Sequence, residues 1–367
     1  MQSDLIYQIA LTQVPQVGCV HARILADHFK TAENIFKAKT SLLEKLEGIG
    51  EVRARHIKAF SDFKSAEKEI RFIEKYKIKP LFVNDASYPK RLLNCYDPPT
   101  LLYYKGEANL NAPKIVSVIG TRTYSEYGKQ LTESLVESLS SQNIIIISGL
   151  AFGVDALAHK ICIKHKIPTV GVLAHGLDTI YPSQHSSLAK EMIKQEGGLL
   201  SEFSSGIKPD KHNFPTRNRI VAGMSDAVVV VESGIKGGSM VTAELANGYN
   251  RDVFAFPGRV NDIKSAGCNE LIKNNKAILL TNANELCEVM GWNDTVKKTK
   301  TIQKELFINL NEREKIITQL LIENNQLSID ELNFRSKLSG TEIAAAILNL
   351  ELQNIIRRLP GKMYMLV

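Results

Sequence analysis

The sequence of 367 residues predicts an α/β fold in which helices cover both faces of a parallel sheet. The first observation is that short, largely β-branched runs alternate with longer amphipathic stretches between residues 113 and 292. The second is that these runs are apolar almost without interruption, as buried parallel strands are. Strands are expected at 114–120, 143–149, 168–174, 198–203, 227–233, 252–258 and 276–281. Helices are expected between them at 124–141, 153–166, 183–196, 217–225 and 238–250.

Before this domain, residues 1–80 are expected to form a helical domain with two glycine turns, at 14–18 and 46–57. The second turn, LEGIGEVRARHI, has the form of a helix-hairpin-helix. Such a turn either packs two helices together or directs N–H groups at a phosphate, and the sequence leaves both open. A connecting segment at 81–112 is expected to lead into the sheet.

After the sheet, the polar, lysine-rich residues 293–306 are expected to be a linker. Residues 307–367 predict a winged-helix-like domain, because three helical stretches precede two strand-like pieces. Residues 341–352 carry few side chains of the kind that read DNA bases, which favours protein contact or packing. Three cations of the hairpin favour DNA instead. They are Arg357, Arg358 and Lys362.

The charge is distributed unevenly along the chain. There are 46 Lys and Arg against 39 Asp and Glu, a formal net charge of +7, which permits a polyanionic partner without requiring one. Residues 1–112 hold 17 basic and 13 acidic side chains, and residues 113–294 hold 18 of each. The predicted sheet domain must therefore bind any anion through local geometry and not through its net charge.

The composition excludes several classes of protein. Hydrophobic residues make up 44% and charged residues 23%, which is typical of a folded globular chain and not of a disordered one. The sequence shows no leader-like start and no apolar run long enough to span a membrane, so a cytoplasmic protein is expected. The five cysteines are scattered without metal-ligand spacing, and neither a metal nor a cofactor is expected.

Three loops that follow predicted strands are rich in glycine and small hydroxyl residues. Ligands bind outside the carboxyl ends of the strands in open parallel sheets, and glycine at a helix start exposes N–H groups to an anion. The loops are Gly120-Thr121-Arg122, the segment from Ser148 to Gly153, and the segment from Gly237 to Thr242. Several anion cradles on one edge of a sheet favour a ligand with several phosphates, or nucleic acid.

A fourth segment, at 208–219, places Phe214 among basic side chains. A nucleobase can stack on such a ring while Lys211 and the arginines hold the flanking phosphates. The alternative is that Phe214 packs in the core and that Arg217 or Arg219 pairs with a carboxylate. Asp226 and Glu232 are the candidate carboxylates.

A catalytic site is poorly supported. Neither a dinucleotide-binding glycine fingerprint, nor a P-loop, nor a hydrolase or zinc-protease motif is present. Asp155 and His159 lie four residues apart on one predicted helix, but no further histidine or carboxylate completes a metal site there. Asp155 near a helix start is interpreted as a capping residue.

Taken in order, the motifs of the sheet domain resemble the DNA-processing protein A (DprA/Smf) family. They are GTR at 120–122, SGLAFGVDALAH at 148–159, the Gly176-Leu177-Asp178 and Tyr181-Pro182 turn, SEF at 201–203, FPTRNR at 214–219, GMSDAVVVVE at 223–232, GGSMVTAELA at 237–246 and FPG at 256–258. The resemblance implies an extended Rossmann-like sheet with a helix-hairpin-helix or SAM-like N-terminal domain and a C-terminal winged helix.

The resemblance also implies a function. Such a protein is expected to bind single-stranded DNA, protect it and load the RecA recombinase onto it during natural transformation, as a homodimer through the Rossmann-like domain and without being an enzyme. The residues expected at or beside the DNA are Gly120, Thr121, Arg122, Ser148, Gly149, Leu150, Ala151, Gly153, Lys211, Phe214, Arg217, Asn218, Arg219, Gly238, Ser239 and Thr242.

The competing hypothesis is an enzyme. GGSMVTAE is similar to the glycine loop of nucleotide phosphoribohydrolases, in which Glu244 would take the place of the family's glutamate. The third glycine of that loop is missing here, and the segment at 214–219 does not belong to that pattern. A purely structural scaffold, which would bind neither ligand, is the third class.

Overall fold

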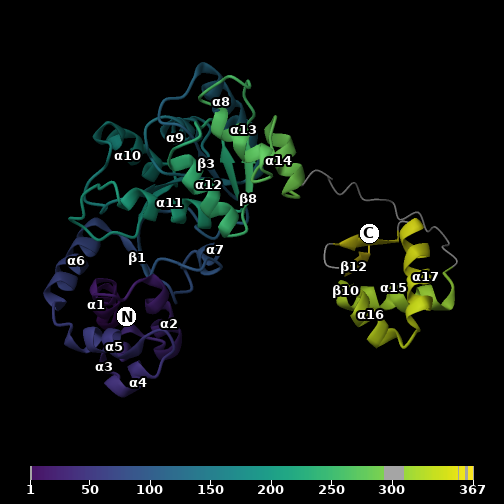
Figure 1. Ribbon diagram of the computed structural model, residues 1–367, viewed down its shortest axis with the longest axis horizontal. Coiled ribbons are helices and arrows are strands. Elements are labelled where there is room, and N and C mark those ends of the chain that lie inside the picture. The colour runs from purple at the N-terminus through teal and green to yellow at the C-terminus, as the bar shows by residue number, and fades with distance from the viewer. Residues whose placement is uncertain (1, 293–309, 354, 360–362, 367) are drawn as a thin grey trace. The chain divides into compact units, whose positions relative to one another are not determined.

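The computed structural model describes residues 2–292, 310–353, 355–359 and 363–366 (Figure 1). The chain divides into two compact units, Met1–Asn293 and Asp294–Val367. The linker expected at 293–306 lies outside the described residues. In the described part of the chain, no helix is both long and apolar enough to cross a membrane.

A sheet of nine strands forms the centre of the first unit, in the order β1-β2-β6-β5-β4-β3-β7-β8-β9 (Figure 1). Its strands are β1 (Lys79–Phe82), β2 (Leu101–Gly106), β3 (Ile115–Ile119), β4 (Ile145–Ser148), β5 (Thr169–Leu173), β6 (Gly198–Ser201), β7 (Ala227–Val230), β8 (Asp252–Ala255) and β9 (Ile278–Leu279). The seven strands from β6 to β9 in this order are parallel to one another, which confirms the predicted α/β class. All seven predicted strands are present, although β9 keeps only two of its six expected residues.

Helices cover both faces of the sheet. On one face α8 (Glu126–Leu139), α9 (Val154–Lys164) and α14 (Ala283–Val289) pack on Val116 and Val118 of β3. On the other face α11 (Asn213–Gly223), α12 (Gly238–Gly248) and α13 (Ala266–Lys273) contribute to the larger core cluster. A separate small cluster forms under α10 (Ser186–Lys194). Successive side chains of a strand point to opposite faces, so a strand covered on both sides is apolar at nearly every position.

Two strands join the sheet from the segment expected only to connect domains. β2 pairs antiparallel with β6, from Tyr103 opposite Ser201 to Gly106 opposite Gly198, and β1 pairs antiparallel with β2. The sheet is therefore mixed at this edge and not parallel throughout. The apolar run at 101–104 could have been recognised as a strand, but its direction depends on the turn that precedes it.

The N-terminal helices pack against this antiparallel edge. They are α1 (Gln2–Gln13), α2 (Cys19–Phe29), α3 (Ala32–Lys37), α4 (Thr40–Glu44), α5 (Gly50–Ala59) and α6 (Phe63–Tyr76), with the short α7 (Lys90–Leu93) between β1 and β2. Their apolar residues are continuous with one core cluster of the sheet. In the turn between α4 and α5, Gly48 and Gly50 have φ of +86° and +65°, a conformation that glycine adopts without strain. Arg53 donates to the Gly48 and Ile49 carbonyls, which fixes the turn.

The second unit is a winged helix, as predicted. It comprises α15 (Glu312–Asn324), β10 (Gln326–Ser328), α16 (Ile329–Ser336), α17 (Gly340–Leu352), β11 (Ile356–Leu359) and β12 (Met363–Leu366), with strand order β10-β12-β11. The solvent face of α17 carries the exposed residues Ala345, Leu348 and Leu352. Arg357 and Arg358 are exposed on β11, whereas Lys362 lies outside the described residues.

Candidate functional site

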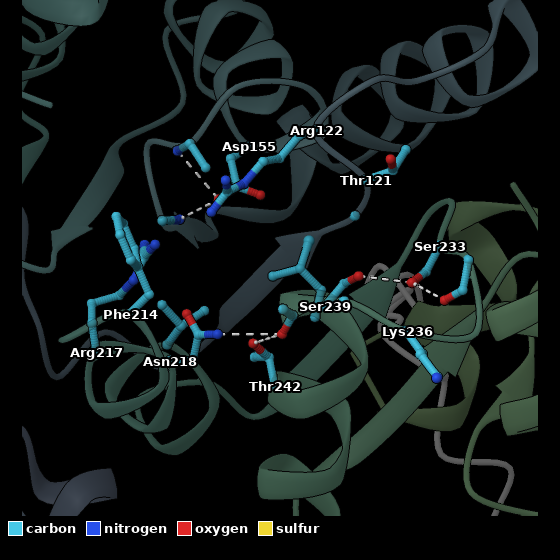
Figure 2. A pocket seen from close by; sticks show the side chains of 18 residues that line it. Thr121, Arg122, Asp155, Phe214, Arg217, Asn218, Ser233, Lys236, Ser239 and Thr242 are labelled. Carbon is cyan, nitrogen blue, oxygen red and sulfur yellow. Dashed lines mark hydrogen bonds between the residues drawn. The ribbon is translucent and has the colours of Figure 1, made fainter. Parts of the chain in front are cut away.

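A cavity of about 350 Å³ lies at the carboxyl ends of β3, β4 and β7 (Figure 2). Its walls come from the loops after these strands and from the starts of α11 and α12, so the predicted loops do converge. The sequence-predicted residues that line it are Gly120, Thr121, Arg122, Gly149, Ala151, Phe214, Arg217, Asn218, Gly238, Ser239 and Thr242. This is the edge at which open parallel sheets hold their ligands.

One wall is the N-terminus of α12. The residue before the helix, Gly237, offers no side-chain acceptor to the first N–H groups, which a helix leaves without intrahelical partners. Side-chain hydrogen bonds hold the backbone here: Thr242 Oγ1 donates to the Gly238 carbonyl at 2.9 Å, and Asn218 Nδ2 donates to the same oxygen at 3.3 Å (Figure 2). The hydroxyls of Ser233 and Ser239 lie 2.8 Å apart. N–H groups and a helix dipole directed at the cavity favour an anion.

The loop after β4 offers fewer free N–H groups than the sequence predicted. Asp155, in the first turn of α9, accepts from the N–H groups of Gly149 at 3.1 Å and Ala151 at 3.4 Å. The Ser148 hydroxyl donates to the Val118 carbonyl at 2.7 Å, and the Leu150 side chain is buried. A carboxylate of the protein itself therefore occupies two of the N–H donors that were expected to meet a phosphate.

Arg217 forms part of the cavity wall. Its side chain is 4% exposed, Nη1 donates to the Val172 carbonyl at 2.8 Å, and Nε has no hydrogen-bond partner among the described residues. Burial lowers the pKa of Arg217 and raises the pKa of Asp155, and each charge opposes the shift of the other. A Cβ atom on Gly149 would lie 1.8 Å from Arg217 Nη1, so glycine is needed there for space.

Phe214 provides a flat apolar surface at the mouth of the cavity. The helix α11 begins at Asn213 and not at 217, because proline is tolerated in the first turn and Pro215 does not delay the start. The half-buried Phe214 ring lies 5.7 Å from the Arg122 guanidinium and 6.2 Å from the Tyr181 ring. A ring flanked by a cation and a second ring is the arrangement on which nucleobases stack.

Besides Ser148 and Leu150, three predicted residues do not line this cavity. Lys211 is exposed before α11 and is not part of the cavity wall. Gly153 precedes α9 with φ of +86°, and a Cβ there would lie 2.1 Å from the Thr121 carbonyl oxygen, so it serves the packing of two loops. Arg219 points away from the cavity, because residues two apart on a helix face different directions. It is buried and donates to the Glu202 carboxylate and to the Asp97 carbonyl.

The carboxylates proposed as partners of these arginines have other roles. Asp226 accepts two hydrogen bonds from Arg91, at 2.6 and 2.8 Å. Glu232 is buried and accepts from the backbone N–H of Ser125, at the start of α8. An arginine–carboxylate pair was correctly anticipated for Arg219, but the partner is Glu202, which follows a strand distant in sequence.

The residues considered for catalysis, His159 and Glu244, have structural roles. His159 is buried, its Nδ1 lies 2.7 Å from Thr169 Oγ1, and Thr169 in turn donates to the Ile146 carbonyl. Burial lowers the pKa of His159 to about 3. Glu244 forms an ion pair with Lys276 at 2.8 Å and does not line the cavity. Among the described residues, no group of three or more His, Cys, Asp or Glu could hold a metal ion.

The sequence reasoning missed six residues of the wall. They are Ile119, Asp155, Val221, Ser233, Gly234 and Lys236. Lys236 directly precedes the glycines of the third loop and carries a cation to the α12 N-terminus (Figure 2). A lysine beside a glycine-rich helix start was a usable signal, whereas the place of Asp155 depends on how the β4–α9 loop folds back.

Comparison with known families covers most of the chain. Residues 79–291 match the model of the DNA recombination-mediator protein A family. Residues 9–70 match a helix-hairpin-helix motif, and residues 310–362 match the DprA winged helix domain.

Individual relatives agree with this result. The chain is 38% identical over 297 residues to protein Smf of Synechocystis, covering 79% of this chain and 73% of the relative. A crystal structure of DNA processing protein A from Streptococcus pneumoniae is similar with a TM-score of 0.66 and 29% identity, over 77% of this chain and 97% of the other. A structure of the Helicobacter pylori protein, described for its single-stranded DNA binding mode, is similar with a TM-score of 0.52 and 32% identity, over 59% and 97% of the two chains.

Proposed function

This chain belongs to the DNA recombination-mediator protein A (DprA/Smf) family of DNA-processing proteins, and we propose that the cavity between α11 and α12 binds single-stranded DNA. The observation that carries the proposal is one cavity with a stacking ring on one side and an uncapped helix N-terminus on the other. The ring is Phe214 beneath Arg122, and the helix N-terminus is that of α12 beside Lys236.

The roles follow from the chemistry of each wall. The N–H groups of α12, with Lys236, bind a backbone phosphate, and a base stacks on Phe214. Arg122 contacts the phosphate next to that base. Because Asp155 already uses the Gly149 and Ala151 donors of the β4–α9 loop, we expect that loop to shape the cavity more than to bind a phosphate. Duplex DNA is excluded, because its paired bases are not free to stack on a protein ring.

The direct test is binding of a fluorescent oligothymidylate at several salt concentrations. Arg122→Ala should weaken binding and lower the slope of log affinity against log salt by about 0.7, the value for one lost single-strand phosphate contact. Phe214→Ala should weaken binding by about 1–3 kcal/mol and leave that slope unchanged. Lys276→Ala removes an exposed cation outside the cavity wall and is the matched control. Equal effects of the first and third variants would contradict the proposal.

We further propose that the chain acts as a homodimer. In the described part of the chain, β9 ends the sheet, and Ile278 and Leu279 on it are 42% and 46% exposed. Edge strands with exposed apolar side chains favour pairing with another chain. Sedimentation should show that Leu279→Glu lowers the fraction of dimer, whereas Val289→Glu on α14, which is also half exposed, should not. A monomer at all concentrations of the wild type would refute this proposal.

We also propose that the DNA-bound protein loads the RecA recombinase in the cytoplasm during natural transformation. Membership of a recombination-mediator family supports this proposal. RecA-dependent ATP hydrolysis on DNA precoated with single-strand-binding protein should rise when the chain is added. It should fall back with Arg122→Ala if loading depends on the cavity, and no stimulation by the wild type would refute the proposal.

A further inference from the structure

The surface around the cavity continues on the side of Arg122. This residue lines the main cavity and two neighbouring hollows, so the three adjoin at its side chain. One neighbour is narrow and is lined by Tyr181, Phe152 and Phe214. The other is open, with a volume of about 630 Å³, and runs past Tyr124 to Lys264. Together they form a groove, which we call the rim groove, from Tyr181 to Lys264.

Aromatic side chains are exposed along the rim groove. Tyr181 is 52% exposed, Phe152 is 45% exposed and Tyr124 is 38% exposed. Tyr181 lies 6.2 Å from the Phe214 ring, and Phe152 makes an edge contact with His185 at 4.9 Å. Rings at such exposure leave a large part of their apolar surface free to stack on a ligand.

The charged side chains that the structure describes along the rim groove are basic and not acidic, which favours a negatively charged ligand. Arg122 and Lys264 lie on its walls, and among the described residues that line the two hollows none is an aspartate or glutamate. Rings interleaved with cations and free of carboxylates complement a chain that carries both flat faces and negative charges. Single-stranded DNA has this chemistry, and the rim groove is continuous with the cavity proposed to bind it.

The β4–α9 loop supports the same assignment independently. Its N–H donors at Gly149 and Ala151 are taken by Asp155, yet the loop exposes Phe152 between two small residues. What it presents to the groove is therefore a ring and not an anion site.

We propose that the rim groove binds the nucleotides that flank those in the cavity, with bases stacked on Tyr181, Phe152 and Tyr124 and a phosphate beside Lys264. The inference rests on the proposed function, since the flanking nucleotides belong to the same strand. Stacking does not distinguish between bases, so this extension adds affinity and length to the site without sequence preference.

The test compares two lengths of oligothymidylate, about 4 and about 16 nucleotides, which bracket the site sizes of single-strand-binding folds. Fluorescence anisotropy of the full chain should show that Phe152→Ala and Tyr124→Ala each weaken binding of the long oligonucleotide. We expect at least about fivefold, the lower end of what one stacked base contributes. Binding of the short oligonucleotide should change by a clearly smaller factor, because fewer of its nucleotides extend from the cavity into the rim groove.

Tyr76→Ala is the matched control, because Tyr76 is a similarly exposed ring at the end of α6. Thermal unfolding of every variant shows that it is folded. Unchanged binding of the long oligonucleotide in both groove variants would overturn the inference, and so would an equal loss at both lengths. If the wild type bound neither oligonucleotide, the proposed function itself would fail, and this extension with it.

Discussion

Glycine at position 149 is needed for space and not for backbone conformation, because the φ of Gly149 is not in the left-handed region. An alanine Cβ there would lie 1.8 Å from Arg217 Nη1 and 2.5 Å from Cζ, so the guanidinium must move by more than an ångström. The move breaks the 2.8 Å bond to the Val172 carbonyl. A lost hydrogen bond from a charged group costs about 1.5–3 kcal/mol, and the buried Asp155 also loses part of its compensating charge. We expect Gly149→Ala to lower the free energy of unfolding by about 2–4 kcal/mol.

Urea unfolding followed by tryptophan fluorescence measures this change. Trp292 is the chain's one tryptophan and packs in the core cluster beneath α8 and α9. Gly248→Ala is the matched control, because a Cβ at this helical position would meet nothing within 4 Å. It should stabilise the protein by about 0.5–1 kcal/mol, through helix propensity and a less flexible unfolded chain. If Gly149→Ala were as stable as Gly248→Ala, Arg217 would not be fixed as described.

Three further predictions concern stability and salt. Burial lowers the pKa of His159 to about 3, so the folded state favours the neutral ring. The contribution of this neutral ring to the free energy of unfolding is fully present above pH 6.5. It is lost as pH falls from 6.5 towards about 3, by at most about 5 kcal/mol. His159→Asn, which cannot ionise, should flatten this part of a stability–pH curve, and an unchanged curve would contradict the assignment. Arg91→Ala leaves the partly buried Asp226 without its ion pair and should cost about 3 kcal/mol in urea unfolding, whereas a cost below about 1 kcal/mol would mean that water replaces the pair. Lys236→Ala should lower the slope of log DNA affinity against log salt by about 0.7. An unchanged slope would contradict the proposed phosphate contact at the α12 N-terminus.

Most of the fold could be predicted because its strands are covered on both sides. A strand such as β7 is apolar at every position and is therefore recognisable in the sequence. The helices α8, α9 and α12 lie in longer amphipathic stretches. The helices α13 and α14 were missed, because eight and seven residues give too short a period to recognise. The strands β1 and β2 were also missed, and apolar pattern carries no information on their antiparallel pairing.

The candidate site was predicted as far as loops and strand ends determine it. Gly120, Phe214 and Ser239 could be placed on one edge because parallel strands align their carboxyl ends there. What pattern could not supply was the contact made by each polar group. Asp155 accepts from two N–H groups that looked free, and Arg219 faces Glu202 because it lies two positions beyond Arg217 on the same helix.

The pairing of β2 with β6 determines how this protein can be divided. A fragment that began at residue 113 would lack β1 and β2, so Leu199 and Leu200 of β6 would lie on a newly made sheet edge. It would also lose Glu69, whose carboxylate accepts from the N–H of Ser205 just after that strand. A piece for crystallisation or domain exchange should therefore keep β1, β2 and Glu69, as residues 2–292 do, because a piece that begins at 113 would report on an aggregation-prone edge.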